Sequence, residues 1–140
     1  MSEKIGACII ILDQTRKQVL LGKRISDHKS GFYGLPAGSI NERESIVDCA
    51  KRELFEEVGL KTNELKYVGV IREYDSNGSF IHFAFLCDKY NGKIILKEPN
   101  KCEKWEFFTL DKLPKNILNG HKAAIEIFTS KNDKGLRDIV

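Results

Sequence analysis

Three glutamates close together in the sequence have the spacing to act on one metal ion. Glu53, Glu56 and Glu57 are related by i,i+3 and i,i+4, and on an α-helix, which turns about 100° per residue, they share one face. Like charges at this spacing repel by about 0.2–0.5 kcal/mol per pair. A hard divalent cation reverses that repulsion, and Mg²⁺ prefers oxygen ligands and is often shared with substrate phosphates. The residues alone leave a solvated helix face as the alternative, because glutamate is a good helix former.

A helix over residues 45–58 is predicted to carry these glutamates. Ser45 and Asp48 have the spacing of a capping box at its start, and Gly59 provides a stop at its end. Apolar residues recur along one side at helical spacing and border the acidic face: Ile46, Val47, Ala50, Leu54 and Val58. We therefore expect the helix to pack on a core, with the glutamates at the edge of that core.

Strands account for most of the other predicted elements. The patterns predict strands at 5–12, 18–23, 67–74, 80–87, 93–96 and 105–110, and a second helix at 121–130. Asn77-Gly78 is a hairpin signal between two of the strands. On the 80–87 strand, Phe83 and Phe85 should face the core, and His82 should lie on the opposite face, either at the surface or towards a cleft. The mixed order predicts an α+β fold, a mixed sheet with helices packed on it.

Composition excludes several classes of protein. At 140 residues, with 41% hydrophobic and 31% charged residues, the chain fits one soluble globular domain over residues 1–140. No apolar run approaches the roughly 18–20 residues of a membrane span, and residues 1–4 lead directly into a predicted strand, so we expect no signal peptide. The four cysteines form no C-x-x-C pair. We expect a reduced, cytoplasmic protein with no membrane association.

A longer motif surrounds the glutamates. The pattern G-x5-E-x7-R-E-U-x-E-E-x-G-U, where U is aliphatic, is matched at every defined position by Gly38, Glu44, Arg52, Glu53, Leu54, Glu56, Glu57, Gly59 and Leu60. This is the Nudix box, over residues 38–60, and the chain resembles the Nudix hydrolases, especially the MutT-like nucleoside triphosphate pyrophosphohydrolases. Weaker similarity covers most of the chain. The resemblance implies a Nudix-type α/β/α sandwich, with a mixed β-sheet between helices.

The resemblance also implies a role for each box residue. Glu56 and Glu57 would be the main ligands of Mg²⁺ or Mn²⁺, Glu53 would be a third ligand or the general base, and Gly38 would lend its backbone carbonyl. Water would then attack a phosphorus of a pyrophosphate bridge. Phosphoryl transfer needs cations to offset the charge of the phosphate oxygens and to position the attacking water.

Other charged residues have implied roles around this centre. In several relatives a glutamate downstream of the box completes the metal site or acts as base, and Glu98 is the candidate here, with Glu103 as its competitor. Either could instead be an ordinary surface carboxylate. Glu44 and Arg52 would hold the box loop to the helix by an ion pair.

Substrate-binding candidates precede the box. Lys23 and Arg24 could bind phosphate or face the base, although a basic residue at a strand end is usually only solvated. Phe32 and Tyr33 could stack on a nucleobase, which contributes roughly 1–3 kcal/mol per base. The alternative is that these two aromatic side chains pack on the core.

The expected substrate is a small nucleotide. The signatures of the diadenosine polyphosphate, ADP-ribose and NADH subgroups are absent, which favours a MutT-like reaction giving a nucleoside monophosphate and pyrophosphate. The alternatives are hydrolysis of ADP-ribose or a sugar nucleotide, and a Nudix module that binds nucleotides without cleaving them. A net charge of +3 gives little support for binding RNA. We expect no stable nucleic-acid partner, and either a monomer or a homodimer.

Overall fold

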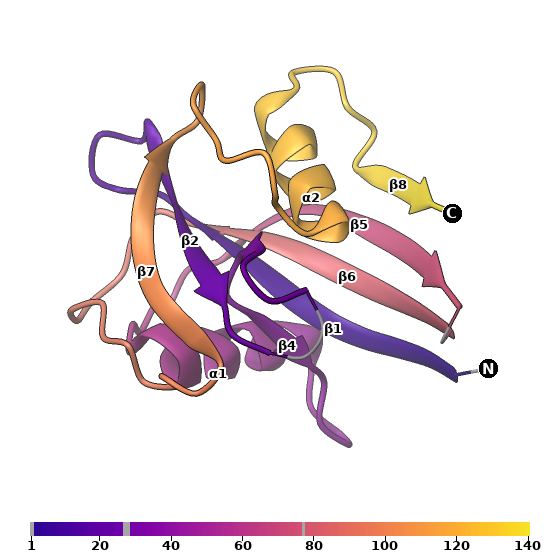
Figure 1. Cartoon of the computed structure of the whole chain (residues 1–140), viewed down its shortest axis with the longest axis horizontal. Helices are drawn as coiled ribbons and strands as arrows, with labels where there is room; N and C mark the ends of the chain where they lie inside the picture. The colour runs from indigo at the N-terminus through magenta and orange to yellow at the C-terminus, as the bar shows by residue number, and fades with distance from the viewer. Residues whose placement is uncertain (1, 27–28, 77) are drawn as a thin grey trace.

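The computed structural model describes residues 2–26, 29–76 and 78–140 of the chain (Figure 1). Two helices and eight strands follow one another in a mixed order. The elements are β1 (Ser2–Ile11), β2 (Gln18–Arg24), β3 (Tyr33–Gly34), β4 (Ala37–Ser39), α1 (Ile46–Val58), β5 (Lys66–Asp75), β6 (Gly78–Cys87), β7 (Cys102–Thr109), α2 (Asn119–Thr129) and β8 (Leu136–Ile139). No described helix combines the length and the apolar character that crossing a membrane would require.

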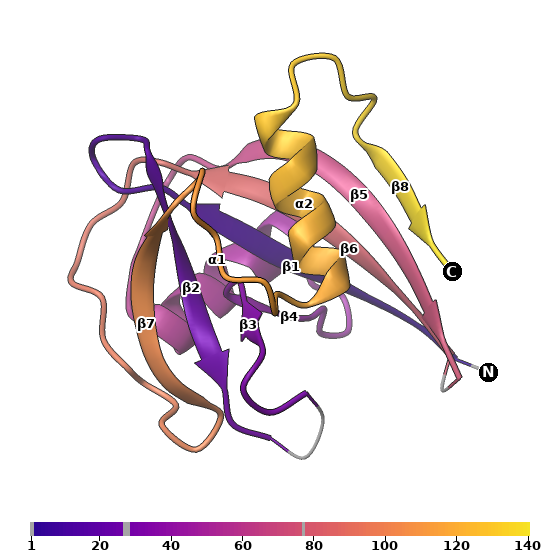
Figure 2. The same cartoon turned by 45° about the horizontal axis from the view of Figure 1, so that its top comes forward.

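The strands form two sheets. The larger has the order β4-β1-β6-β5-β8, and the smaller has the order β3-β2-β7. Within the larger sheet β1 runs parallel to β6 and antiparallel to β4, and β5 runs antiparallel to β6 and parallel to β8. The predicted mixed sheet is therefore confirmed. The smaller sheet stands beside one end of the larger one (Figure 2).

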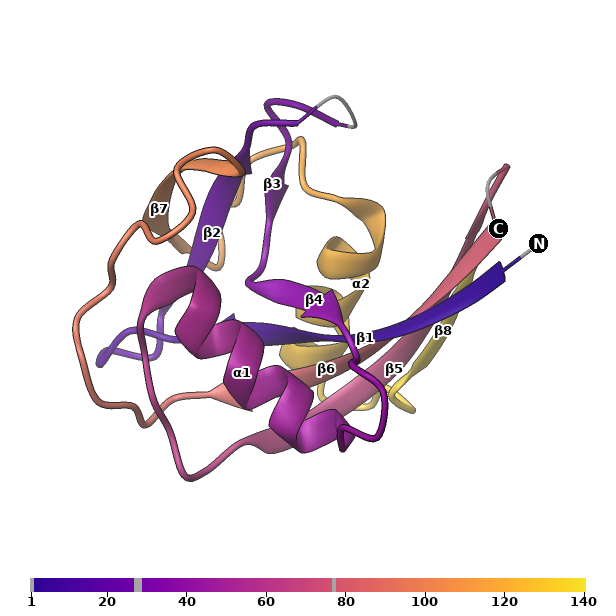
Figure 3. The same cartoon turned by 90° about the horizontal axis from the view of Figure 1, so that it is seen from below.

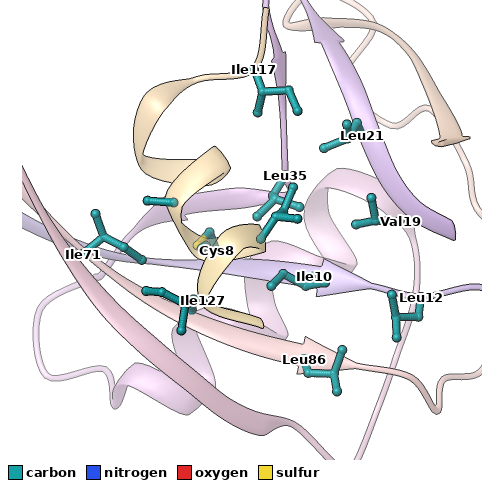
Figure 4. Close-up of a cluster of buried hydrophobic side chains, with 14 residues drawn as sticks. Cys8, Ile10, Leu12, Val19, Leu21, Leu35, Ile71, Leu86, Ile117 and Ile127 are labelled. Atoms are coloured by element: carbon teal, nitrogen blue, oxygen red, sulfur yellow. The ribbon is translucent and has the colours of Figure 1, made fainter. Parts of the chain in front are cut away.

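Strand β1 separates two hydrophobic clusters, because its alternate side chains point to opposite faces. Ile9 and Ile11 pack with the buried face of α1, whereas Cys8 and Ile10 pack with the buried face of α2. The helices thus cover the two faces of the larger sheet (Figure 3), and Figure 4 shows the cluster on the α2 side. This arrangement is the α/β/α sandwich that the sequence predicted.

Helix α1 begins and ends at the predicted residues. The Ser45 side chain accepts a hydrogen bond from the Asp48 backbone N–H (3.1 Å), and Gly59 ends the helix with φ of 78°. This left-handed conformation favours glycine, which has no Cβ. The predicted apolar stripe is wrong at Val47, which is 42% exposed. Side chains of a first turn point back beyond the end of the helix, and the buried position in this turn is Cys49.

The predicted and observed elements differ at two further places, and one predicted turn falls outside the described residues. Residues 93–96 form no strand: the Ile95 N–H donates to the Val58 carbonyl (3.0 Å), so this segment follows the end of α1 instead of joining a sheet. The short strands β3 and β4 and the last strand β8 were not predicted. Asn77 of the predicted hairpin turn lies outside the described residues, although β5 and β6 pair up to Asp75 and Gly78.

Candidate active site

The glutamates of α1 gather around one guanidinium group. Arg52 donates to both carboxylate oxygens of Glu44 (2.7 and 3.0 Å), to Glu53 (2.7 Å) and to Glu56 (3.2 Å), and also to the Ser39 carbonyl (3.0 Å). Hydrogen bonds from Arg52 hold the pKa of Glu44 at about 2. Arg52 therefore ties the loop before α1, through Glu44, to the helix that carries Glu53 and Glu56. Charge-assisted bonds of this kind are the stronger hydrogen bonds in proteins.

Gly38 lies directly against Glu53. A Cβ atom built on Gly38 would lie 2.1 Å from the Glu53 carboxyl carbon. This distance is far shorter than a van der Waals contact, so no side chain fits at position 38 while Glu53 keeps its place. The absence of a side chain at position 38 is what allows strand β4 and the Glu53 carboxylate to approach so closely. Ala37 has no positive φ, so an alanine before Gly38 is compatible with the backbone here.

Glu57 differs from the other glutamates because it has no basic partner. None of the ion pairs among the described residues includes it, and its closest polar contact with the backbone is a long one, from the Ala37 N–H (3.4 Å). Burial, and then the charges of Glu53 and Glu98, raise the pKa of Glu57 to about 8. Burial also raises the pKa of Glu53. The centre of the acidic face therefore lacks positive charge.

Glu98 and Glu103 lie in different surroundings. Glu98, in the segment before β7, pairs with Lys101 (3.5 Å), and its charge reaches Glu57. Glu103, within β7, pairs with Lys23 (3.4 Å), and its side chain is 53% exposed. Of the two candidates from outside the helix, Glu98 is the one whose charge acts on the acidic face.

A divalent cation fits the donors of this face by their chemistry. Carboxylate oxygens and a backbone carbonyl are the ligands that Mg²⁺ prefers. Burial first, and then the charges of Glu53 and Glu98, raise the pKa of Glu57, so a nearby cation would favour its ionised form. Among the residues that the structure describes, no three His, Cys, Asp or Glu side chains already converge on one point. Arg52 instead holds Glu53 and Glu56.

A cleft of about 520 Å³ adjoins the acidic face at Gly38, which belongs to its lining. Of the predicted substrate residues, Arg24 and Phe32 line this cleft and Lys23 and Tyr33 do not. Tyr33 instead packs edge-on against Phe108 in the core, with ring centroids 5.2 Å apart. The structure therefore brings together only two of the four.

Two buried histidines belong to this cleft, and the sequence predicted only one of them as a possible cleft residue, whereas His121 was not identified. His82 was expected at the surface or towards a cleft, and it is buried in the cleft lining together with His121. The two come from β6 and α2, about 40 residues apart in the chain, and neither has a local motif. Only the packing of α2 over β6 brings them together, so no sequence signal could have identified the pair.

Comparison with known proteins decides the family. The NUDIX domain family model matches residues 3–128, nearly the whole chain. The chain belongs to the Nudix family. The residues of its Nudix box are those whose contacts bring Gly38, Glu53 and Arg52 together.

Relatives within the Nudix family carry different names. The chain is 30% identical over 124 residues to an ADP-ribose pyrophosphatase of Methanocaldococcus jannaschii, covering 87% of this chain and 72% of that protein. It is 31% identical over 115 residues to a NAD-capped RNA hydrolase, NudC, of Vibrio vulnificus, covering 79% of this chain but only 41% of that protein. The chain thus spans less than half of the NudC relative.

Solved Nudix structures agree with the fold. A MutT NUDIX hydrolase from Burkholderia pseudomallei superimposes with a TM-score of 0.86 at 25% identity, covering 92% of this chain and the whole of that one. A MutT protein from Methanosarcina mazei gives a TM-score of 0.81 at 20% identity, over 94% of this chain and 96% of that one. Both sheets and both helices of the present structure therefore belong to a known Nudix architecture.

Proposed function

We propose that the protein hydrolyses the pyrophosphate linkage of a nucleoside triphosphate, with Mg²⁺ or Mn²⁺ as cofactor, and releases a nucleoside monophosphate and pyrophosphate. The observation that carries this proposal is Glu57, a carboxylate in a partly buried position beside Glu53 and Glu98 with no basic partner among the described ion pairs. Burying an unpaired carboxylate costs free energy, and a bound cation would offset that cost. Carboxylates in such surroundings are therefore common at functional sites. The proposed substrate is a free nucleotide of the cytoplasm.

The box residues would hold the cation. In this proposal Glu56 and Glu57 supply its main ligands, and Glu53 and the Gly38 carbonyl supply others. A bound divalent cation offsets the charge on phosphate oxygens and lowers the pKa of a coordinated water. Glu98 or Glu53 would accept the proton of the attacking water. Glu98 is favoured over Glu103 as the base from outside the helix, because its charge acts on Glu57.

Arg52 and Glu44 would position this machinery without touching the substrate. Their paired hydrogen bonds hold the loop that follows Gly38 against α1, and catalysis by positioned charges depends on groups that do not have to reorganise during the reaction. In the adjoining cleft, Arg24 and Phe32 would contact the rest of the nucleotide.

The comparisons support two candidate substrates. The MutT NUDIX hydrolase from Burkholderia pseudomallei covers nearly the full chain in structure, and its name agrees with the resemblance to MutT-like enzymes from which a nucleoside triphosphate is inferred. The ADP-ribose pyrophosphatase of Methanocaldococcus jannaschii, matched over most of both chains, favours ADP-ribose as the second candidate. Both reactions break a pyrophosphate bridge and would use the same residues.

A product assay separates these candidates. Purified protein is incubated with each nucleoside triphosphate, ADP-ribose and a sugar nucleotide, with Mg²⁺ or with EDTA. The nucleoside monophosphate formed is measured by chromatography, and phosphate is measured with and without added inorganic pyrophosphatase. We expect turnover of a triphosphate that requires Mg²⁺ and gives phosphate only when pyrophosphatase is present. Turnover of ADP-ribose alone would change the substrate and keep the chemistry. Nucleotide binding without any turnover would identify a non-catalytic module.

A further inference from the structure

The floor of the cleft contains two buried imidazoles. His82 on β6 is 8% exposed and His121 on α2 is 6% exposed, and both line the cleft of about 520 Å³. Their ring centroids lie 5.5 Å apart, with the ring planes nearly perpendicular at 87°. They are the buried polar or charged side chains of the described part of the chain. A buried polar side chain normally has hydrogen-bond partners for its donors and acceptors, so the partners of each ring nitrogen decide what this floor can bind.

The first nitrogen of each ring is fixed by the protein. The Leu35 backbone N–H donates to His121 Nδ1 (2.9 Å), so Nδ1 carries no proton and Nε2 does. Burial lowers the pKa of His121 to about 3, which keeps this ring neutral. His82 Nε2 lies 3.0 Å from Glu73 Oε1. A carboxylate oxygen accepts, so the geometry assigns the tautomer in which His82 Nε2 donates, and in that tautomer Nδ1 is left as an acceptor.

The second nitrogen of each ring has no hydrogen-bond partner in the described chain. Arg24 Nε is the single fully enclosed side-chain nitrogen or oxygen without a partner among the described residues, so these two ring nitrogens keep some exposed surface. Both of their residues line the cleft. The floor thus presents one donor, His121 Nε2–H, and one acceptor, His82 Nδ1. Their protonation is set by different neighbours, Leu35 and Glu73.

We propose that His82 and His121 form a base-recognition pair, in which His121 Nε2 donates to, and His82 Nδ1 accepts from, one edge of a nucleobase. This proposal rests on the proposed function, and adds how the substrate's heterocycle is held. Nucleobases carry adjacent donors and acceptors on their edges. The ring of His82 is itself stacked on Phe80, with centroids 4.5 Å apart, which fixes the plane from which its nitrogens point.

An uncharged ring suits this floor better than a second anionic group. Glu73 lies 3.0 Å from His82, and any anion placed at the imidazoles would meet its carboxylate. His121 is neutral and offers one N–H. Arg24 lines the same cleft and its charge acts on His121, but no ion pair within the described chain joins it to Glu73 or to either ring. A planar heterocycle meets no such cost, and it satisfies one donor and one acceptor that otherwise have no partner.

Unphosphorylated nucleosides test the proposal without metal or hydrolysis. The imidazole nitrogens are followed by long-range ¹H–¹⁵N NMR at pH 8 with EDTA, while adenosine, cytidine, guanosine or uridine is added. We expect at least one nucleoside to shift both His82 Nδ1 and His121 Nε2, and its ring-N-methylated analogue (N1-methylguanosine for guanosine, N3-methyluridine for uridine) to bind at least tenfold more weakly. The proposal is overturned if no nucleoside shifts both nitrogens, whether or not inorganic phosphate does.

Kinetics provide a second, independent test. His82→Phe keeps a ring against Phe80 and removes both nitrogens, and it should raise KM for the preferred triphosphate about tenfold while kcat stays within twofold. Glu64→Gln, a surface carboxylate paired with Lys89 at 3.7 Å, is the matched control and should change neither. A loss of kcat at unchanged KM would assign His82 to the chemical step and overturn base recognition. If the wild-type protein hydrolyses nothing, the proposed function fails, and the nucleoside titration still decides this proposal.

Discussion

The acidic face of α1 and the floor of the cleft meet at Gly38 and differ in how their polar groups are held. On α1, carboxylates are crowded together and one guanidinium, Arg52, contacts Glu44, Glu53 and Glu56. At the floor of the cleft, each of two imidazoles has one hydrogen-bond partner, and no lysine or arginine forms an ion pair with either Glu73 or the rings within the described chain.

This difference shows two ways of preparing a polar site. On the acidic face the carboxylates repel one another, and a bound cation would reduce this repulsion. This face is therefore suited to a positively charged ligand. At the imidazole floor, His121 Nε2–H is a donor and His82 Nδ1 is an acceptor without a hydrogen-bond partner in the described chain. This floor is therefore suited to a ligand whose edge carries a matching acceptor and donor. Changes on α1 should therefore act mainly on the chemical step, and changes at the floor mainly on binding and on stability in acid.

The largest effect is expected from Glu57→Gln. The amide keeps the size of the side chain but removes the charge that a cation would need, so kcat should fall by roughly 10³-fold, within the range found for positioned acid–base and metal-binding groups. The thermal midpoint without metal should stay the same or rise, because the variant no longer buries an ionisable group at this position. Steady-state kinetics and thermal melts measure both. Activity within tenfold of wild type would remove Glu57 from the mechanism and weaken the contrast between the two regions.

A smaller loss is expected from Gly38→Ala. The added Cβ would lie 2.1 Å from the Glu53 carboxyl carbon, so the flexible Glu53 side chain has to leave its place while the strand remains. We expect kcat to fall by roughly 10²-fold, as when one preorganised group is lost, and the protein to stay folded.

A double-mutant cycle with Glu53→Ala checks that cause. If Gly38→Ala acts by displacing Glu53, it should cost little more in the Glu53→Ala background, since the two residues are in contact. Full additivity of the two changes would show that Gly38 contributes through something other than Glu53.

The smallest effect is expected on the free energy of unfolding, which should fall at acidic pH because of His121. Its pKa is about 6.5 in the unfolded chain and about 3 in the folded one, so the unfolded state takes up a proton first as the pH falls. The stability that this difference provides is present above pH 6.5 and is lost towards pH 3. Between pH 6.5 and 5.5 this amounts to about 1 kcal/mol in the free energy of unfolding.

Urea unfolding at the two pH values measures this loss. His121→Gln retains an acceptor for the Leu35 N–H and cannot be protonated, so it should lose about 1 kcal/mol less than the wild type over the same interval. Equal losses in the two proteins would show that His121 is protonated in the folded state, and would remove the basis for its assigned tautomer.

The acidic face could be predicted from the sequence because its determinants are local. The spacing of Glu53, Glu56 and Glu57 fixes their common face on any helix, and Ser45 and Gly59 mark where that helix begins and ends. Hydrophobic patterning likewise predicted the main strands and the α+β class. A strand was wrongly predicted at 93–96, because a short aliphatic run carries no information about whether a partner strand lies beside it.

The floor of the cleft depends on contacts that no local pattern encodes. Glu73 pairs with Phe80 across β5 and β6, which makes His82 its diagonal neighbour, and His121 reaches the same place only because α2 packs over the sheet. His121 Nδ1 accepts its hydrogen bond from the backbone N–H of Leu35, which is 86 positions away in the chain. The packing of the partly buried Tyr33 against the core and the exclusion of Lys23 from the cleft are likewise set by strand register and not by residue type.

The segment from Leu35 to Gly38 touches both regions, since the Leu35 N–H donates to His121 and Gly38 lies against Glu53. Three residue steps can span at most about 11 Å. The length of this segment therefore sets an upper limit on the distance between the imidazole floor and the acidic face. Substitutions in these four residues change which group is held at either end, whereas an insertion or a deletion would change the greatest separation that the chain allows between the two regions.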